Sequence, residues 1–267
     1  MMISYKDKVV WITGASSGIG EALALAFSKL GAKLILSARR KEELERVMKK
    51  CKLNDTNCMI LPFDLADTSK ITAITDEAIQ KFSRIDILVN NGGISQRSYT
   101  KDTPLEIDRK IMEINYFGTI AVTKTVLPHM LRQKNGSIIV MSSVSGKFGF
   151  YLRSAYAASK HALHGFFESL RMEMYKENIN VLLVCPGKIK TDISINAITE
   201  KGTKHGKMDP SQENGIPAEE CAKQIVDALN SGKEEIYVGQ ARERKALWVK
   251  RIFPKLFSKK IRKQKPE

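Results

Sequence analysis

The chain has 267 residues, 43% of them hydrophobic, which is enough for a substantial core, and no apolar run approaches the roughly 18 residues of a membrane span. The formal net charge is +15, but residues 241–267 contribute +9 of it, from eleven Lys or Arg against two Glu. The remaining charge is ordinary for a soluble protein and no nucleic-acid-binding module accompanies it, so we expect no nucleic-acid partner.

The start of the chain and the cysteines indicate the compartment. A strand pattern begins at Lys8 and leaves no room for a signal peptide. The four cysteines lie in periodic apolar segments without metal-type spacing, so we expect reduced thiols in the core: Cys51, Cys58, Cys185 and Cys221. These features predict a cytoplasmic protein.

Strand and helix patterns alternate along most of the chain. Short β-branched runs predict seven strands, at 8–13, 33–37, 58–63, 85–90, 137–142, 180–185 and 235–238. Helical periodicity follows the first strand and recurs at 41–50, 67–82, 104–133, 154–175 and 217–230. This order predicts one α/β domain over residues 1–240, a doubly wound Rossmann fold with a seven-stranded, mostly parallel sheet.

Two segments stand outside this alternation. Residues 188–216 are polar and glycine-rich, and their length is typical of a substrate lid. In the basic tail, residues 241–267, apolar and aromatic residues alternate with Lys and Arg, and Pro254 predicts a division into two short amphipathic helices. Two interpretations stay open: the tail contacts an anionic membrane as a peripheral anchor, or its apolar side covers the lid or a second subunit of a homo-oligomer.

A glycine-rich loop connects the first strand to the first helix. In such a loop, backbone N–H groups and the helix N-terminus face a pyrophosphate. The loop therefore predicts dinucleotide contacts from Gly14, Ser16, Ser17, Gly18, Ile19 and Gly20.

Further motifs follow in order: Asn90-Asn91-Gly92-Gly93, Ser143, Tyr156-Ala-Ala-Ser-Lys160 and Pro186-Gly187-x-Ile189-x-Thr191. With TGASSGIG, they resemble the short-chain dehydrogenase/reductase family from about Lys8 to Thr191. NNGGISQRS and SAYAASKHALHGFFESLRME further resemble the member-seven group of that family. The resemblance implies additional cofactor contacts from Asp64, Leu65, Asn90, Asn91, Gly92, Tyr156, Lys160, Pro186, Gly187, Ile189 and Thr191.

The end of the second strand indicates which nicotinamide cofactor is preferred. Dinucleotide folds that bind NAD place an acidic residue there, but this chain has Ala38 followed by Arg39 and Arg40. Arginine suits a phosphate, so the sequence favours NADP(H) over NAD(H). The alternative is that both arginines are merely solvated at the start of a helix.

Tyr156 and Lys160 are four residues apart on a predicted helix, so they share one face and the ammonium favours the ionised phenol. The resemblance implies that Tyr156 is the acid/base and that Lys160 also binds the nicotinamide ribose. It also implies that Ser143 bonds the substrate oxygen, since the family serine lies thirteen residues before the tyrosine. Asn115 matches a family asparagine that holds a water in a proton relay, and asparagine is a poor mid-helix residue, which indicates a kink or a function.

The sequence thus predicts an NADP(H)-dependent oxidoreductase that interconverts a carbonyl and a secondary alcohol, with no metal. Its substrate would be a small molecule, and a lipophilic one if the tail contacts lipid. His161 and His164 have a spacing that could chelate a metal, but the family chemistry needs none. The alternative is a cofactor-binding interaction protein whose basic tail binds a membrane or a partner.

Overall fold

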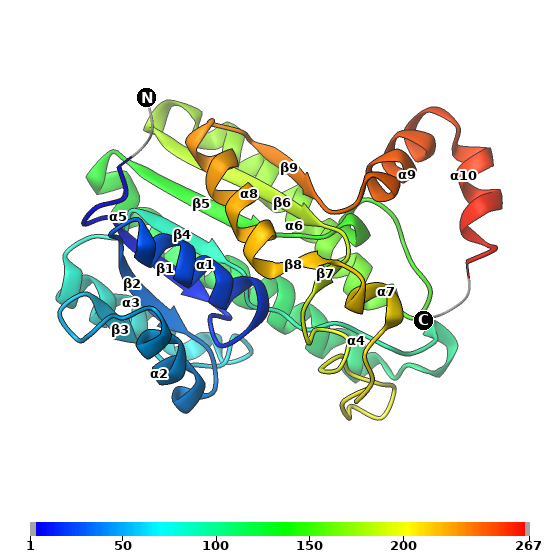
Figure 1. Cartoon of the computed structure of the whole chain (residues 1–267), viewed down its shortest axis with the longest axis horizontal. Helices are drawn as coiled ribbons and strands as arrows, with labels where there is room; N and C mark the ends of the chain where they lie inside the picture. The colour runs from blue at the N-terminus through cyan, green and yellow to red at the C-terminus, as the bar shows by residue number, and fades with distance from the viewer. Residues whose placement is uncertain (1–3, 265–267) are drawn as a thin grey trace.

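The computed structural model describes residues 4–264 and is built on a seven-stranded parallel sheet in the order β3-β2-β1-β4-β5-β6-β9 (Figure 1). The strands are β1 Val9–Thr13, β2 Lys33–Ser37, β3 Cys58–Ile60, β4 Ile87–Asn90, β5 Gly136–Met141, β6 Ile179–Pro186 and β9 Glu235–Val238. Every neighbouring pair in this sheet is parallel. The predicted Rossmann architecture is confirmed, and the sheet is more uniformly parallel than predicted.

Helices cover both faces of the sheet (Figure 1). One face carries α1 (Gly18–Lys29), α2 (Lys41–Lys50) and α8 (Ala218–Asn230), and the other carries α3 (Ile71–Phe82), α5 (Gly118–Gln133) and α6 (Ser154–Glu173). Successive β1 residues point to opposite faces, so Val10 and Ile12 join one core while Val9 and Trp11 join the other. Burial on both sides explains why the strands read as continuous apolar runs.

Two predicted elements end differently from their sequence patterns. β3 ends at Ile60 instead of Phe63, although the N–H groups of Leu61 and Phe63 still donate to the carbonyl oxygens of Leu36 and Ala38 at 3.0 and 3.2 Å. The long helix predicted over 104–133 is divided into α4 (Leu105–Met112), a π-helical turn (Glu113–Phe117) and α5. The π turn surrounds Asn115, the residue whose poor helix propensity predicted a local irregularity.

The two ends of the predicted lid segment, residues 188–216, lie side by side. β7 (Ile189–Lys190) pairs with β8 (Ile216–Pro217) in a separate two-stranded sheet, and α7 (Pro210–Glu213) lies between them. The sequence did not predict this small sheet. Pro217 belongs to β8, so α8 begins one residue later than predicted, at Ala218.

The basic tail forms the two predicted helices, α9 (Ala241–Ile252) and α10 (Pro254–Ile261), and its last three residues, 265–267, lie outside the described part of the chain. Phe257 of α10 packs edge-to-face on Phe148, with ring centroids 4.9 Å apart. The Tyr151 hydroxyl donates a hydrogen bond of 3.3 Å to the carbonyl oxygen of Arg262. The inner side of the tail therefore packs on the loop that follows β5 in the same domain.

All four cysteines are free and buried, as predicted. Burial raises the pKa of Cys58, Cys185 and Cys221 to about 12, which keeps these thiols protonated. Among residues 4–264, no helix has the length and hydropathy needed to cross a bilayer.

Candidate active site

The N-terminus of α6, which carries Tyr156, is capped by a residue from another segment. The preceding residue, Arg153, makes no side-chain capping bond. Instead, the Oε1 atom of Gln96, in the loop after β4, accepts hydrogen bonds from the backbone N–H of Ala155 at 2.9 Å and Tyr156 at 3.2 Å. Gln96 has no exposed surface, so this contact sets where the first turn of α6 lies.

Tyr156 is 8% exposed and faces Ser143 at the end of β5. Burial raises the pKa of the Tyr156 phenol, while a hydrogen bond with Ser143 and the positive charges of Arg153 and Arg97 act in the opposite direction. The neighbouring Ser142 instead donates to the carbonyl oxygen of Lys160 at 3.2 Å. Ser143 is therefore the serine beside the phenol, and its predicted bond to the substrate oxygen stays a prediction.

The Lys160 ammonium is directed away from the Tyr156 phenol, beside which the sequence predicted it. Its Nζ atom donates a hydrogen bond of 2.7 Å to the carbonyl oxygen of Met141 and lies 5.8 Å from the centroid of the Tyr156 ring. Burial lowers the pKa of Lys160 from 10.5 to about 8. Burial outweighs the opposing effects of Ser143 and the two arginines, so the phenol pKa is raised and not lowered as expected. Lys160 does not oppose the rise, because its ammonium is directed at β5.

Asn115 joins the loop after β4 to α6. Its Oδ1 accepts from the N–H of Ile94 at 2.8 Å, and its Nδ2 donates to the Ile94 carbonyl and to Ser159 Oγ, both at 3.0 Å. A Cβ at Gly93 would lie 3.0 Å from Asn115 Oδ1 and 3.7 Å from Lys160 Nζ. Gly93 therefore lies between the predicted relay asparagine and the lysine.

Ser143, Tyr156 and Lys160 line a cavity of about 600 Å³. Pro186, Gly187 and Ile189 form part of the same wall. The opposite wall combines aromatic residues after β5 with inward residues of the tail, among them Phe148, Phe150, Val249, Phe257 and Ile261. The predicted catalytic residues thus meet in one cavity, with Asn115 fully buried behind it.

A second cavity, of about 300 Å³, lies along the glycine-rich loop. Most of the predicted cofactor residues line it: Gly14, Ser16, Ser17, Gly18, Ile19, Arg39, Arg40, Asp64, Leu65, Asn91, Gly92 and Thr191. Ile19, Asn91 and Thr191 belong to both cavities, so the two are adjacent. A dinucleotide could therefore extend from one into the other.

The backbone of the glycine-rich loop fits such a ligand. Gly14 and Gly18 have φ values of +64° and +57°, which favour glycine. A Cβ at Gly20 would lie 2.3 Å from the Gly14 carbonyl oxygen, so Gly20 acts by permitting close packing rather than by lining the cavity. The Asn91 amide donates to the carbonyl oxygens of Thr13 and Gly14 at 3.0 and 3.1 Å and holds the loop in place.

Asn90, like Gly20, is a predicted cofactor residue that lies outside both cavities. Its side chain is directed into the core, where Nδ2 donates a hydrogen bond of 2.8 Å to Thr123 Oγ1. It is the last residue of β4 and is 3% exposed. Its contribution is to attach β4 to α5.

A buried ion cluster connects the lid segment to the catalytic wall, and the sequence analysis missed it. Arg97 and Asp209 form an ion pair in which each side chain is 2% exposed, and Arg153 bonds the same carboxylate at 3.0 Å. Burial disfavours the ionised carboxyl, but the hydrogen bond and charge of Arg97 hold the pKa of Asp209 below its usual value. No local pattern indicates this cluster, because its members are far apart in the chain.

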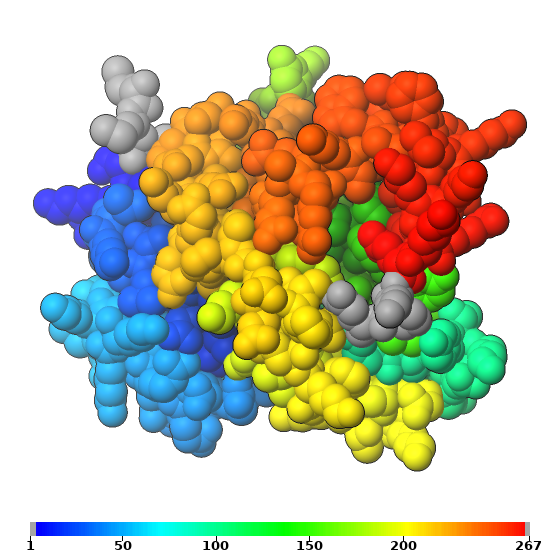
Figure 2. All heavy atoms as spheres, turned by 45° about the vertical axis from the view of Figure 1, so that its right-hand side comes forward, coloured from blue at the N-terminus to red at the C-terminus, as the bar shows by residue number. Residues whose placement is uncertain are grey.

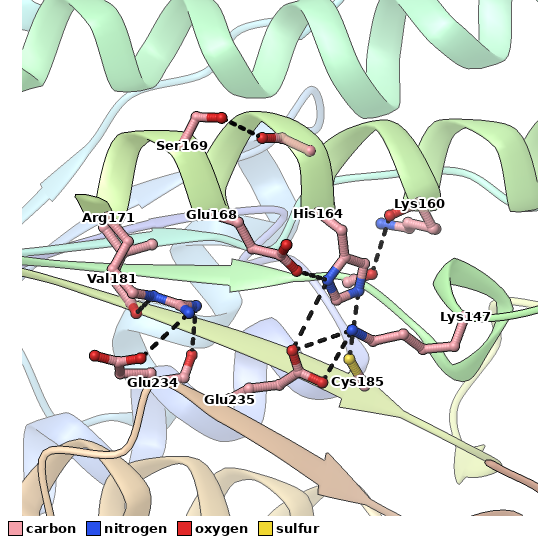
Figure 3. A network of polar contacts seen from close by, with 12 residues as sticks. Lys147, Lys160, His164, Glu168, Ser169, Arg171, Val181, Cys185, Glu234 and Glu235 are labelled. Carbon is pink, nitrogen blue, oxygen red and sulfur yellow. Dashed lines mark hydrogen bonds and ion pairs between the residues drawn. The ribbon is translucent and has the colours of Figure 1, made fainter. Parts of the chain in front are cut away.

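His161 and His164 do not converge. His161 contacts the Ala157 carbonyl oxygen, whereas His164 Nδ1 lies 3.2 Å from Glu168 and 4.0 Å from Glu235 (Figure 3). His164, Glu168 and Glu235 have the donor set of a metal site, but Lys147 Nζ bonds the Glu235 carboxylate at 3.1 Å. The cluster thus has its own cation and joins α6 to β9 beside Cys185 (Figure 3).

A family model described as short chain dehydrogenase matches residues 8–202. A protein of Anopheles gambiae named dehydrogenase/reductase SDR family protein 7-like is 44% identical over 255 residues, which cover 94% of this chain and 80% of that relative. Human dehydrogenase/reductase SDR family member 7 is 44% identical over 239 residues, which cover 88% of this chain and 70% of the relative.

Solved structures are similar over the whole chain. A short-chain dehydrogenase from Streptomyces avermitilis has a TM-score of 0.81 at 26% identity, and the match covers 96% of this chain and 97% of that structure's chain. A short chain dehydrogenase/reductase from Burkholderia phymatum, solved in complex with NAD, has a TM-score of 0.84 at 21% identity, covering 100% of this chain and 98% of its own. Because the sequence identity to this second structure is only 21%, the similarity shows a shared fold and nothing further.

Replacing Gln96 by leucine should destabilise the protein by about 1–3 kcal/mol, because the Ala155 and Tyr156 amides lose their buried acceptor. Gln96→Glu keeps an acceptor at the helix N-terminus and should lose less. Urea unfolding of both variants measures the difference. Equal stability of Gln96→Leu and the parent protein would contradict the capping role.

Lys160→Met should stabilise the ligand-free protein at neutral pH by about 1–2 kcal/mol, because it removes a desolvated charge at the cost of one hydrogen bond. The pKa of Lys160 is lowered from 10.5 to about 8 on folding, so the parent protein gains stability as the pH rises through that interval. The advantage of the variant should therefore shrink above about pH 8. Thermal unfolding across this range tests the prediction, which fails if the difference is independent of pH.

Proposed function

The chain belongs to the short-chain dehydrogenase/reductase family, and from this premise we propose that it is an NADP(H)-dependent oxidoreductase that interconverts a carbonyl and a secondary alcohol. The observation that carries the proposal is the convergence of Ser143, Tyr156 and Lys160 on one cavity beside the glycine-rich loop. A bound nicotinamide cofactor supplies or accepts the hydride. The protein then has to orient the substrate and move one proton.

Tyr156 is the proposed proton donor in the direction of reduction. Its phenol passes a proton to the carbonyl oxygen as negative charge develops there, and takes a proton back in the reverse direction. Ser143, which lies close enough to the phenol to oppose the rise in its pKa, is proposed to orient the same oxygen. The positive charges of Arg97 and Arg153 favour the phenolate that remains after proton transfer.

Lys160 and Asn115 are proposed to hold the cofactor ribose and to return the proton. Lys160 is 5% exposed and has a pKa lowered to about 8, so it can exchange a proton near neutral pH. Asn115 stands next to it across Gly93, at the π turn. This arrangement supports the relay that the family resemblance implies.

The preference for NADP(H) rests on Arg39 and Arg40. Both are exposed at the rim of the second cavity, directly after β2, and no carboxylate follows this strand where an NAD-type fold would have one. Lys204, from the lid segment, lines the same cavity and adds a third cation. The NAD complex of the Burkholderia phymatum relative supports a nicotinamide cofactor in general, so NAD(H) is the alternative.

The proposed substrate is a small carbonyl or alcohol with a lipophilic body. The first cavity has aromatic and aliphatic walls beyond the catalytic residues, including Phe148, Phe150, Val249 and Ile261. The tail supplies part of the wall of this cavity, so it serves the site that holds Tyr156. This argues against the alternative, an interaction protein without catalysis whose tail only binds a membrane or a partner. Four buried free thiols support our proposal of a cytoplasmic setting.

Tyr156→Phe should lower turnover by at least about 100-fold while leaving NADPH affinity nearly unchanged, because only the transferable proton is removed. A panel of ketones and aldehydes, followed by NADPH absorbance, first identifies a substrate for the parent protein. Cofactor titration by fluorescence supplies the binding control. Undiminished turnover by the variant would refute the assignment of Tyr156.

Arg39→Ala should weaken NADPH binding about tenfold and NADH binding much less, because only NADPH carries the 2′-phosphate. Lys41→Ala is the matched control, since Lys41 is exposed on α2 but does not line the cavity. Isothermal titration with both cofactors measures the two ratios. Equal losses for NADPH and NADH would exclude a phosphate contact from Arg39.

A further inference from the structure

The tail has a second apolar side that its own domain does not cover. Of the eleven large hydrophobic side chains exposed in the described chain, four lie around the junction of α9 and α10. They are Trp248 (66% exposed), Ile252 (56%), Phe253 (59%) and Leu256 (45%). We call these four residues, with Arg251 and Lys255 between them, the tail face.

The tail face is distinct from the side that packs on the domain. Val249, Phe257 and Ile261 are partly buried and line the catalytic cavity. None of the four exposed residues is among that lining. The contacts that hold α9 and α10 in place therefore leave the tail face exposed.

The tail is anchored firmly enough to present a defined surface. Glu243 completes a capping box with Gln240 at the start of α9 and also accepts a hydrogen bond of 3.3 Å from the backbone N–H of Lys188. Lys250 Nζ donates to the carbonyl oxygen of Lys147 and lies 6.0 Å from the Phe148 ring centroid. Figures 1 and 2 show α9 and α10 at one corner of the molecule, and in Figure 2 side chains project outward from this corner.

The charge around the tail face is almost entirely positive. Residues 241–264 contain ten Lys or Arg, three of which line the first cavity (Arg242, Lys245 and Lys260). The one acidic residue is Glu243, whose carboxylate is engaged by backbone N–H groups. Within residues 4–264, none of these ten cations forms an ion pair with a carboxylate. The occupant of this surface must therefore supply negative charge as well as an apolar environment.

We propose that the tail face docks on the surface of an anionic lipid bilayer. Apolar side chains with aromatic members and flanking cations fit the boundary between anionic headgroups and acyl chains. A second copy of the chain would bring a tail of the same positive charge and repel it. A nucleic acid offers phosphates but leaves the aliphatic side chains of Ile252 and Leu256 without an apolar partner.

Docking would place the catalytic cavity beside the lipid, because the same two helices form its outer wall. A lipophilic substrate could then pass from the bilayer to Tyr156 without crossing bulk water. This consequence rests on the proposed catalytic function, but the docking itself does not.

Sedimentation of the full chain with vesicles tests the docking without substrate or cofactor. The parent protein should bind vesicles of equal parts phosphatidylserine and phosphatidylcholine, bind pure phosphatidylcholine weakly, and be released by salt. The double variant Trp248→Ser/Phe253→Ser should bind the anionic vesicles at least tenfold more weakly. Met172→Ser/Tyr175→Ser is the matched control, since these residues are 72% and 82% exposed elsewhere, and it should bind as the parent does.

Three results would overturn the docking proposal. The first is that the parent protein does not bind anionic vesicles. The second is that Trp248→Ser/Phe253→Ser binds them as tightly as the parent does. The third is that the control variant loses as much affinity as Trp248→Ser/Phe253→Ser. The independent pair Ile252→Ser/Leu256→Ser must reproduce the loss, and circular dichroism checks that each variant is folded. Sedimentation velocity tests whether a second copy of the chain covers the tail face instead. That occupant would be assigned if the parent protein is a dimer and does not bind vesicles, and if the variant Trp248→Ser/Phe253→Ser is a monomer.

Discussion

Parallel pairing of β1 with β4 is the constraint on which the site depends. The pairing of Val10 with Ile87 continues to Ile12 with Val89, so the loops after the two strands emerge side by side. The Asn91 amide can then bond the carbonyl oxygens of Thr13 and Gly14, and a Cβ at Gly14 would come within 2.7 Å of the Gly92 Cα. Because connections in a parallel sheet are crossovers, β5 and β6 deliver their loops to the same edge.

Buried polar groups beside Tyr156 are hydrogen-bonded within the protein. Lys160 satisfies its ammonium with the Met141 carbonyl, and Gln96 supplies the acceptor that the first turn of α6 lacks. Desolvation nevertheless lowers the pKa of Lys160 and raises that of Tyr156. The fold therefore moves the two pKa values apart from the nearly equal values of the free side chains, so the Lys160 ammonium releases a proton more readily than the Tyr156 phenol in the ligand-free protein.

The tail forms part of the wall of the first cavity as well as part of the surface. α9 is attached through Glu243 to the backbone of Lys188, in the motif that follows β6, and α10 is attached through Phe257 to the loop that follows β5. Both attachments are close to Ser143 and Tyr156, since their residues share one cavity. A change in the position of the tail would therefore reach the substrate wall directly.

The amino-acid sequence by itself determined the local features. Strand and helix alternation, the glycine-rich loop, the two tail helices and the irregularity at Asn115 all follow from periodicity, turn chemistry and residue propensity, which act over a few residues. The tertiary structure decided contacts between distant segments: Gln96 on α6, Arg97 with Asp209, the tail on Phe148, and the direction of the Lys160 ammonium. These depend on which loops the sheet brings together and on the desolvation of buried groups, and neither quantity is encoded in the spacing of residues along the chain.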